Sequence, residues 1–351
     1  MEWKGVVRRY RELLPEVSEE NIVTLCEGNT PLLRADNLVR KIGGDLDIYL
    51  KYEGVNPTGS FKDRGMTLAL SVAKEQGASA VICASTGNTS ASAAAYASKA
   101  EVEAYVIIPE GKIAYGKLSQ AIIHGATIIQ VKGNFDEALE IVREISENYP
   151  ITLVNSLNPY RIEGQKTASF EVCDTLGRAP EYHVLPVGNA GNITSYWKGY
   201  KEYHARGIVD NLPKMIGFQA EGAAPIVRGH PLSEPETIAT AIRIGNPASW
   251  KGAIAARDES GGMIAMVSDE EILNAYKLVS STEGIFCEPA SAAGIAGVIR
   301  LVSEGFFSGG ETVVITLTGH GLKDPDIAVK QAVGPVSVQP VLKEVVQELG
   351  L

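Results

Sequence analysis

The sequence has few cysteines, and none of them are spaced as a metal or redox pair. Its four cysteines stand singly, at Cys26, Cys83, Cys173 and Cys287, and no Cys-x-x-Cys motif occurs. This pattern suggests neither a zinc site nor a redox dithiol, and it favours four reduced, mostly buried thiols. We therefore expect no metal site in the chain.

Long apolar runs and an excess of basic charge are also missing. No run approaches the ~20 apolar residues that span a bilayer, and residues 1–17 lack the apolar centre of a signal peptide. Asp and Glu (42) outnumber Lys and Arg (32), which gives a formal net charge of −10 and argues against nucleic acid or an anionic membrane as the main partner. We expect a cytoplasmic protein that binds a small molecule.

Short apolar runs that alternate with longer helical stretches predict an α/β fold. The 351 residues are more typical of two domains than of one. Most β-rich runs are continuously apolar, as in strands buried on both faces, so we predict open, mostly parallel, twisted sheets flanked by helices. The expected strands are Ala80–Cys83, Glu103–Ile108, Ala126–Val131, Thr152–Asn155, Tyr182–Val187, Met215–Gln219 and Thr312–Leu317. The expected helices are Met66–Glu75, Thr89–Lys99, Phe135–Glu147, Ile193–His204, Asp269–Ser281 and Ser291–Val302.

The familiar nucleotide-binding glycine motifs are absent, although a glycine loop does follow one expected strand. G-x-G-x-x-G occurs nowhere, and no Gly-Lys-Ser/Thr follows the loop at residues 186–193 (PVGNAGNI), which excludes the dinucleotide fingerprint and the P-loop. Gly188 and Gly191 let the backbone turn its amides toward one anion. We interpret this loop as a phosphate cradle. The alternative is a tight strand-to-helix turn that happens to need two glycines.

A lysine opens the helix that follows a second turn. In the segment at residues 56–65 (NPTGSFKDRG), Pro57 and Gly59 fix a turn, and Lys62 falls on the first helical turn. The positive end of the helix dipole and partial burial both favour the neutral amine, which can form a Schiff base. The alternative is a surface lysine at a helix start.

A third loop gathers small polar residues at the start of an alanine-rich helix. Ser85, Thr86, Asn88 and Thr89 follow the strand that ends near Cys83. Free backbone amides at such a helix start bind carboxylate or phosphate readily, and Asn88 could reach a ring hydroxyl. The alternative is simply a well-capped helix.

A fourth loop (LTGHGLKD, residues 317–324) follows the last expected strand. The Thr318 hydroxyl lies at the C-terminal end of that strand, where α/β proteins place their ligands. His320 is a candidate base, although a lone histidine is more often structural. Together the four loops fit pyridoxal phosphate (PLP), which needs a lysine for its aldehyde, a nest for its phosphate and a partner for its ring nitrogen.

The same segments resemble the tryptophan-synthase-β-like (fold type II) PLP enzymes, and among them most closely the threonine synthases of the shorter form. The likeness runs from Gly28 to Asp326, nearly the whole chain. The segments TGHGLKD and GNAGN favour the threonine synthases within this group. The matching segments are NPTGSFKDRGM (56–66), ASTGNTSAS (84–92), NSLNPYRIEGQKT (155–167), PVGNAGN (186–192) and TGHGLKD (318–324).

The resemblance implies a fold and a cofactor site. It implies two α/β domains with PLP between them, usually in a homodimer: a smaller domain at 55–153, and a larger one at 1–54 plus 154–351 that carries the phosphate loop. It further implies that Lys62 forms the imine with PLP, that Asn88 contacts the 3-hydroxyl of the ring, and that Thr318 faces the ring nitrogen. The cofactor phosphate is expected to bind to Gly188, Asn189, Ala190, Gly191 and Asn192.

The resemblance also implies a lyase reaction, which is the last step of threonine biosynthesis. Threonine synthases convert O-phospho-L-homoserine and water to L-threonine and phosphate, by β,γ-elimination and then replacement. The alternatives are a threonine or serine dehydratase of the same superfamily, a sulfhydrylase, and a non-catalytic metabolite-binding relative, which would be expected to lose Lys62. Because Thr318 offers a hydroxyl and not a carboxylate, we expect it not to hold the ring nitrogen protonated, which leaves a mild electron sink.

Two groups of residues are expected to bind the substrate. The helix start is expected to take the carboxylate, through Ser85, Thr86 and Thr89. The substrate phosphate is assigned to a strand end and the arginine after it, namely Asn155, Ser156 and Arg161, with Thr89 and Lys117 as weaker candidates. Arg161 can bind phosphate with two parallel hydrogen bonds; the alternative is a surface ion pair of Arg161 with Glu163 or Asp174.

Overall fold

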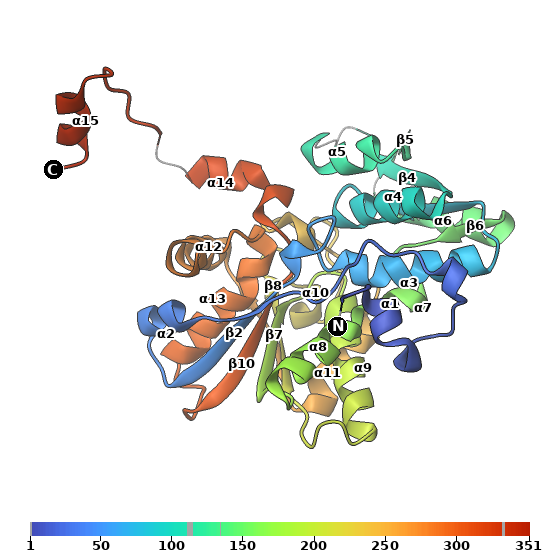
Figure 1. The fold of residues 1–351 in the computed structure, drawn as a ribbon, viewed down its shortest axis with the longest axis horizontal. Coiled ribbons are helices and arrows are strands. Elements are labelled where there is room, and N and C mark those ends of the chain that lie inside the picture. Colours follow the sequence, from blue (N-terminus) through green and yellow to red (C-terminus); the bar gives the residue numbers. More distant parts are fainter. Residues whose placement is uncertain (1, 111–114, 134, 332–333) are drawn as a thin grey trace.

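Two separate sheets, each covered by helices, organise the chain (Figure 1). The computed structural model describes residues 2–110, 115–133, 135–331 and 334–351, and the side chains at 115–117 and 135–136 lie outside this description. The predicted α/β fold with mostly parallel sheets flanked by helices is confirmed.

The smaller sheet has four parallel strands in the order β5-β4-β3-β6. These strands are β3 (Ala80–Ala84), β4 (Glu103–Pro109), β5 (Thr127–Val131) and β6 (Ile151–Leu153). Alternate residues of β3 point to opposite faces, so Val81 joins the apolar cluster with α3 (Lys62–Glu75) and α4 (Asn88–Ala100). Its neighbour Ile82 joins the cluster with α6 (Phe135–Asn148) on the other face. The continuously apolar sequence of these strands follows from burial on both sides.

The larger sheet has six strands in the order β1-β2-β10-β7-β8-β9. Only the edge strand β1 pairs antiparallel, and the other neighbours are parallel. The strands are β1 (Leu32–Arg34), β2 (Leu46–Tyr52), β10 (Glu311–Leu317), β7 (Tyr182–Pro186), β8 (Lys214–Ala220) and β9 (Met263–Val267). One face packs on α2 (Asp36–Ile42), α12 (Asp269–Glu283) and α13 (Pro289–Ser303). The other face packs on α8 (Thr167–Leu176), α9 (Gly191–Ala205) and α11 (Trp250–Ser260).

All seven expected strands and all six expected helices are present, and their ends differ by a few residues from the predicted ones. The prediction missed β1, β2 and β9. The remaining helices are α1 (Val6–Arg9), α5 (Tyr115–Ile123), α7 (Pro159–Gln165), α10 (Pro225–Arg228), α14 (Pro325–Gln331) and α15 (Leu342–Glu348). Among the described helices, none combines the length and the apolar character that a membrane span requires.

The division of the strands between the sheets follows their position in the sequence. Strands of the smaller sheet lie within residues 80–153, whereas those of the larger sheet lie within 32–52 and 182–317. Figure 1 shows the smaller sheet and its helices as one lobe beside the other. The domain limits at residues 55 and 153 agree with this division, and as exact boundaries they remain a prediction.

Candidate active site

A cavity of about 840 Å³ opens where the C-terminal ends of β3, β7 and β10 meet. Ligands of open α/β sheets bind at this end of the strands. Apart from Lys117, whose side chain lies outside the described ones, every residue that the sequence analysis proposed for the cofactor or the substrate lines this cavity. These residues are Lys62, Ser85, Thr86, Asn88, Thr89, Asn155, Ser156, Arg161, Gly188, Asn189, Ala190, Gly191, Asn192 and Thr318. The structure therefore brings the set together, while the role of each residue remains a prediction.

Backbone hydrogen bonds join the lysine loop to the loop after β10. The amide of Phe61 donates to the carbonyl of Thr318 over 3.0 Å, and the amide of His320 donates to the carbonyl of Gly59 over 2.9 Å. Gly59 has a φ of +86°, a value that favours glycine. These contacts set Lys62 beside Thr318 although more than 250 residues separate them in the sequence.

Lys62 is the first residue of α3, and its amine is enclosed by the cavity walls. The Nζ atom lies 3.9 Å from the centre of the Phe61 ring. Burial lowers the pKa of Lys62 to about 7, the positive charge of Arg161 acts in the same direction, and Glu288 opposes both. A large fraction of the amine is therefore neutral near pH 7, as a Schiff-base lysine requires.

The residue after Lys62 fixes the turn that precedes the helix. Asp63 is fully buried and accepts hydrogen bonds from the Thr58 amide (2.7 Å), the Thr58 hydroxyl (2.6 Å) and the Ser92 hydroxyl (2.6 Å). Burial raises the pKa of Asp63 to about 6, and these hydrogen bonds oppose the rise. Asp63 thus ties the lysine loop to α4.

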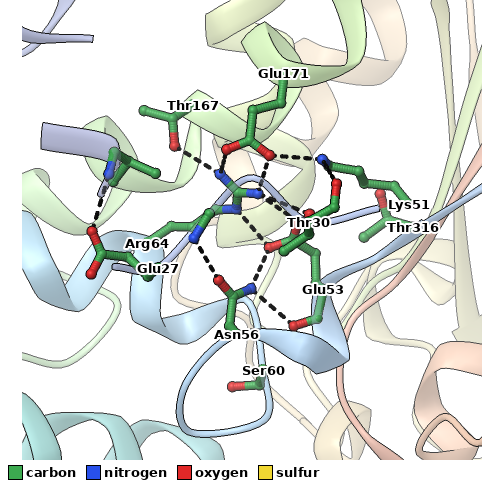
Figure 2. A network of polar contacts seen from close by, with 12 residues as sticks. Glu27, Thr30, Lys51, Glu53, Asn56, Ser60, Arg64, Thr167, Glu171 and Thr316 are labelled. Carbon is green, nitrogen blue, oxygen red and sulfur yellow. Dashed lines mark hydrogen bonds and ion pairs between the residues drawn. The ribbon is translucent and has the colours of Figure 1, made fainter. Parts of the chain in front are cut away.

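A buried network of charges anchors the same helix from its other side (Figure 2). Arg64 donates to Glu53 (2.6 Å) and to Glu171 (2.6 Å), and Lys51 donates to Glu171 (2.7 Å). Burial raises the pKa of Glu171, but Arg64 and Lys51 outweigh it and lower that pKa to about 2. Two cations thus face two carboxylates, which is the pairing that buried charges need. The network joins β2 and α8 to the helix that begins with Lys62.

The glycine loop presents a row of backbone amides that have no partner within the protein. In the described part of the chain, no acceptor is found for the amides of Gly188, Asn189 and Ala190. Gly191 and Asn192 open α9, where the first amides of a helix lack intrahelical partners. The buried side-chain amide of Asn192 is also without a partner among the described residues. Such a cluster of free donors at a helix N-terminus fits a phosphate.

The space around Gly191 is also consistent with a phosphate bound at this loop. A Cβ placed on Gly191 would lie 3.6 Å from Ile162 Cδ1 and 3.7 Å from Ser249 Oγ, which are ordinary contact distances. The position therefore faces room inside the cavity. A Cβ on Gly188 would instead lie 2.9 Å from the backbone of Ile242, so close approach of another loop requires glycine there.

Arg161 is a buried cation that has no carboxylate partner among the described residues. It is 1% exposed, its Nη1 donates to the Val154 carbonyl over 2.7 Å, and its Nε has no partner. Burial lowers the pKa of Arg161 to about 10. The alternative of a surface ion pair is wrong, because Glu163 pairs with Lys166 and Lys198, and Asp174 pairs with Arg9. A buried guanidinium in the cavity wall without a carboxylate partner among the described residues fits an anionic ligand.

The other residues assigned to the substrate phosphate differ in whether their side chains already have hydrogen-bond partners. The Asn155 amide is already engaged with both backbone groups of Ala84, at 2.8 Å and 2.9 Å, so it closes the end of β3. Ser156 lines the cavity beside it. The side chain of Lys117, the weaker candidate, lies outside the described side chains.

The predicted carboxylate site lies at the start of α4. Ser85, Thr86 and Thr89 line the cavity there, and the Ser85 hydroxyl accepts a 3.2 Å hydrogen bond from the Gly87 amide. His320, by contrast, is not part of the cavity wall. Its Nδ1 accepts a hydrogen bond from the Leu322 amide, so this histidine caps a turn, as expected for a structural residue.

Glu288 is a site residue that the sequence analysis missed. It is 3% exposed, lines the cavity, and immediately precedes α13. Its carboxylate accepts hydrogen bonds from Asn88 Nδ2 (3.0 Å) and Thr318 Oγ1 (2.9 Å). Lys323, also missed, lines the cavity and donates to the Thr58 carbonyl over 3.1 Å. The available signal for Glu288 was a lone acid inside the otherwise apolar segment IFCEPASAAGIAG (285–297).

These observations fit PLP. The amine at Lys62 has a lowered pKa, and the free amides at 188–192 together with the unpartnered Asn192 side chain offer donors for a phosphate. Thr318, at the end of β10, provides a hydroxyl in the same cavity. The chemistry of this donor set matches an aldehyde, a phosphate and a heteroaromatic ring, respectively.

Comparison with known proteins identifies the family. A model described as pyridoxal-phosphate dependent enzyme matches residues 23–319. A threonine synthase of Mycobacterium tuberculosis is 59% identical over 352 residues, covering 99% of this chain and 97% of its own. A threonine synthase of Synechocystis is 56% identical over 350 residues, covering 99% and 91%. The solved processed form of threonine deaminase isoform 2 from Solanum lycopersicum shares the fold, with a TM-score of 0.75, 21% identity and coverage of 93% and 94%. The chain therefore belongs to the pyridoxal-phosphate-dependent enzymes and, among them, to the threonine synthases.

Proposed function

We propose that this chain converts O-phospho-L-homoserine and water to L-threonine and phosphate, with Lys62 as the catalytic residue. One observation carries the choice of a phosphorylated substrate. The guanidinium of Arg161 is buried in the wall of the cavity that holds Lys62, and it lacks a carboxylate partner among the described residues. An unpaired buried cation is costly, and an anionic substrate group would compensate it.

The cofactor would be held by residues from three loops. Lys62 would bind its aldehyde carbon, the amides at 188–192 would bind its phosphate, and Asn88 and Thr318 would contact its ring. When bound, PLP supplies an electron-accepting ring that stabilises negative charge on the substrate carbons. The protein supplies orientation, proton transfer and binding of the substrate anions.

Lys62 is suited to move protons once the substrate has displaced it. Its pKa of about 7 leaves a neutral amine that takes the proton from the substrate Cα, because a general base works best with a pKa near the working pH. A further proton is then lost from Cβ, phosphate leaves from Cγ, and Cγ takes up a proton to become the methyl group. The hydroxyl of water adds at Cβ, its proton goes to the released phosphate, and Lys62 or a group relayed to it returns a proton to Cα.

The two anionic ends of the substrate would lie at different walls of the cavity. The α4 N-terminus, with Ser85, Thr86 and Thr89, offers amides and hydroxyls to the carboxylate. Arg161 and Ser156 offer donors to the phosphate. Because Asn155 is engaged with Ala84, we assign it mainly to the shape of this wall. The positive charge of Arg161 also stabilises the phosphate as it leaves.

Incubation of the purified protein with O-phospho-L-homoserine, L-threonine and L-serine in parallel tests the proposal. We expect phosphate release from the first substrate, with one L-threonine formed for each phosphate. Release of an oxo acid from threonine or serine, with no turnover of O-phospho-L-homoserine, would establish the dehydratase alternative. A protein without cofactor absorbance and without turnover of any of the three would be the metabolite-binding relative, against which the intact Lys62 argues.

We also propose that the enzyme is a cytoplasmic homodimer with a smaller domain at 55–153. The proposal of a dimer rests on the likeness to the fold type II enzymes. Exposed apolar residues in and just after α15, such as Leu342 and Leu349, are consistent with a second copy of the chain beside the C-terminal segment. Sedimentation equilibrium of the holoenzyme tests it: we expect twice the 37.4 kDa mass of the chain, and a monomer would contradict the proposal.

A further inference from the structure

The carboxylate of Glu288 connects the two side chains proposed to contact the cofactor ring. One of its oxygens accepts from Asn88 Nδ2 over 3.0 Å, and the other accepts from Thr318 Oγ1 over 2.9 Å. Glu288 is 3% exposed and Thr318 is 5% exposed, so water does not replace these contacts. Glu288 also sits tightly against the backbone, since a Cβ on Gly319 would lie 2.6 Å from its carboxyl carbon.

The hydrogen bond to Glu288 uses the only proton of the Thr318 hydroxyl. A threonine hydroxyl carries one proton and two acceptor lone pairs, whereas an ionised carboxylate only accepts. The Thr318 proton therefore points to Glu288. Ser291 Oγ lies 2.9 Å from Thr318 Oγ1. Because the single Thr318 proton goes to Glu288, Ser291 is the donor in this pair. One lone pair of Thr318 remains, and a group placed against it must bring its own proton.

The hydrogen bonds of Glu288 fit an ionised carboxylate. Both of its oxygens accept hydrogen bonds in the structure, and an ionised carboxylate only accepts. Burial raises the pKa of Glu288 above its ordinary value, and the hydrogen bonds from Asn88 and Thr318 and the positive charges of Lys62 and Lys323 oppose the rise.

We propose that Glu288 acts as a positioning residue that, through Thr318, keeps a proton on the ring nitrogen of the bound cofactor. The inference rests on the proposed function, because it needs PLP in the cavity with its ring nitrogen toward Thr318. The nitrogen donates to the remaining lone pair of Thr318, Thr318 donates to Glu288, and the negative charge of Glu288 balances the positive charge of the protonated ring.

This inference reverses the expectation of a mild electron sink drawn from Thr318 alone. A hydroxyl by itself holds no charge, but a buried carboxylate one hydrogen bond behind it does. A protonated ring withdraws electrons more strongly than a neutral one. The proposed reaction removes protons from two adjacent substrate carbons, and the stronger sink serves that demand.

Nuclear magnetic resonance of the holoenzyme loaded with ¹⁵N-labelled PLP tests the proposal without measuring activity. Free PLP imines in acid and in alkali give the reference shifts of the protonated and unprotonated ring nitrogen. We expect the wild-type signal at the protonated reference. Glu288→Gln keeps the size of the side chain and removes its charge, so the signal should move toward the unprotonated reference.

Three further variants test whether the hydrogen bond from Thr318 to Glu288, and not another contact of Thr318, keeps the ring nitrogen protonated. Thr318→Val removes the link and should give the same shift change as Glu288→Gln, which keeps the test intact if one of the two fails to fold. Thr318→Ser keeps the hydroxyl and should retain the wild-type signal. Ser291→Ala, the matched control, removes the neutral contact to Thr318 and should also leave the ring nitrogen protonated.

The experiment distinguishes a failure of this inference from a failure of the proposed function. If borohydride fixes PLP on Lys62 but the wild-type ring nitrogen is unprotonated, or if Glu288→Gln and Thr318→Val leave it protonated, this inference is overturned and the proposed function stands. If PLP does not attach to Lys62, the proposed cofactor site fails, and the inference fails with it.

Discussion

The guanidinium of Arg161 and the amine of Lys62 line the same cavity, where burial lowers the pKa of Lys62 and the positive charge of Arg161 lowers it further. Two like charges in one buried site oppose each other, so the more easily deprotonated lysine becomes the neutral partner. The residue proposed to bind the substrate phosphate thus also helps to prepare the lysine that binds the cofactor.

The pKa of Lys62 predicts how the apoenzyme reacts with amine reagents. Only the neutral amine is a nucleophile, so labelling of Lys62 should rise with pH and level off above about 7, whereas an ordinary lysine continues to gain reactivity up to about pH 10.4. Peptide-resolved labelling rates between pH 5 and 10 measure this midpoint. In Arg161→Leu the midpoint should move upward, because one positive charge is lost; a midpoint near 10 in the wild type would contradict the buried site.

The position of the cofactor gives a second prediction. The purified holoenzyme should absorb as an imine, and borohydride should abolish this band. Peptide mapping of the reduced protein should then find the pyridoxyl group on Lys62. A nearby lysine in the cavity wall, Lys323, provides the internal comparison, and a label on Lys323 would show that the attachment site has been misassigned.

Gly191→Val should weaken PLP binding without unfolding the protein. The new side chain has room to enter the cavity, where it would cover the amides of the phosphate loop. Loss of one charge-assisted hydrogen bond costs about 1.5–3 kcal/mol, which is roughly ten- to a hundredfold in affinity. Titration of the apoenzyme with PLP measures the change, and Gly191→Ala should lose less. Unchanged affinity in a folded Gly191→Val protein would place the cofactor phosphate elsewhere.

The buried charge network should matter for stability. Arg64→Met leaves Glu53 without its cation and Glu171 with Lys51 alone, and removal of one partner of a buried pair typically costs about 3–5 kcal/mol. Arg34→Met is the matched control, since Arg34 forms only exposed pairs with Asp36 and Asp47, each worth about 0–1 kcal/mol. Urea unfolding of the two apoproteins compares them. Equal losses would show that the network adds nothing beyond a surface pair.

Much of the fold could be predicted because burial on both faces leaves continuous apolar runs. β3 and β7 show this clearly, since all their residues are buried. β2 was missed because its sequence, LDIYLKY, contains charged residues. One of them, Lys51, is buried against Glu171, and its partner lies 120 residues away. Pairing over such a distance is not visible in a local pattern.

The position of the candidate site could be predicted, because the C-terminal ends of parallel strands lie at the same edge of a sheet. The loops after β3, β7 and β10 therefore meet, as expected. The exact partners were not predictable, because they depend on three-dimensional packing. Asn155 is held by the Ala84 backbone, and Glu288 reaches Asn88 across 200 residues of sequence. The lone acid in an apolar segment marks Glu288 as unusual, but it does not indicate which residues Glu288 contacts.

The most direct test of the account compares Arg161→Leu with the wild type on ligands that do and do not carry a phosphate. We expect Arg161→Leu to keep the fold and the cofactor absorbance, and to lose roughly ten- to a hundredfold in kcat/KM for O-phospho-L-homoserine, the cost of one charge-assisted hydrogen bond of about 1.5–3 kcal/mol. Its affinity for L-threonine, followed by the change in cofactor absorbance, should stay within a fewfold of the wild type, because threonine has no phosphate. Equal losses for both ligands, or a wild-type enzyme that does not turn over O-phospho-L-homoserine, would contradict the account.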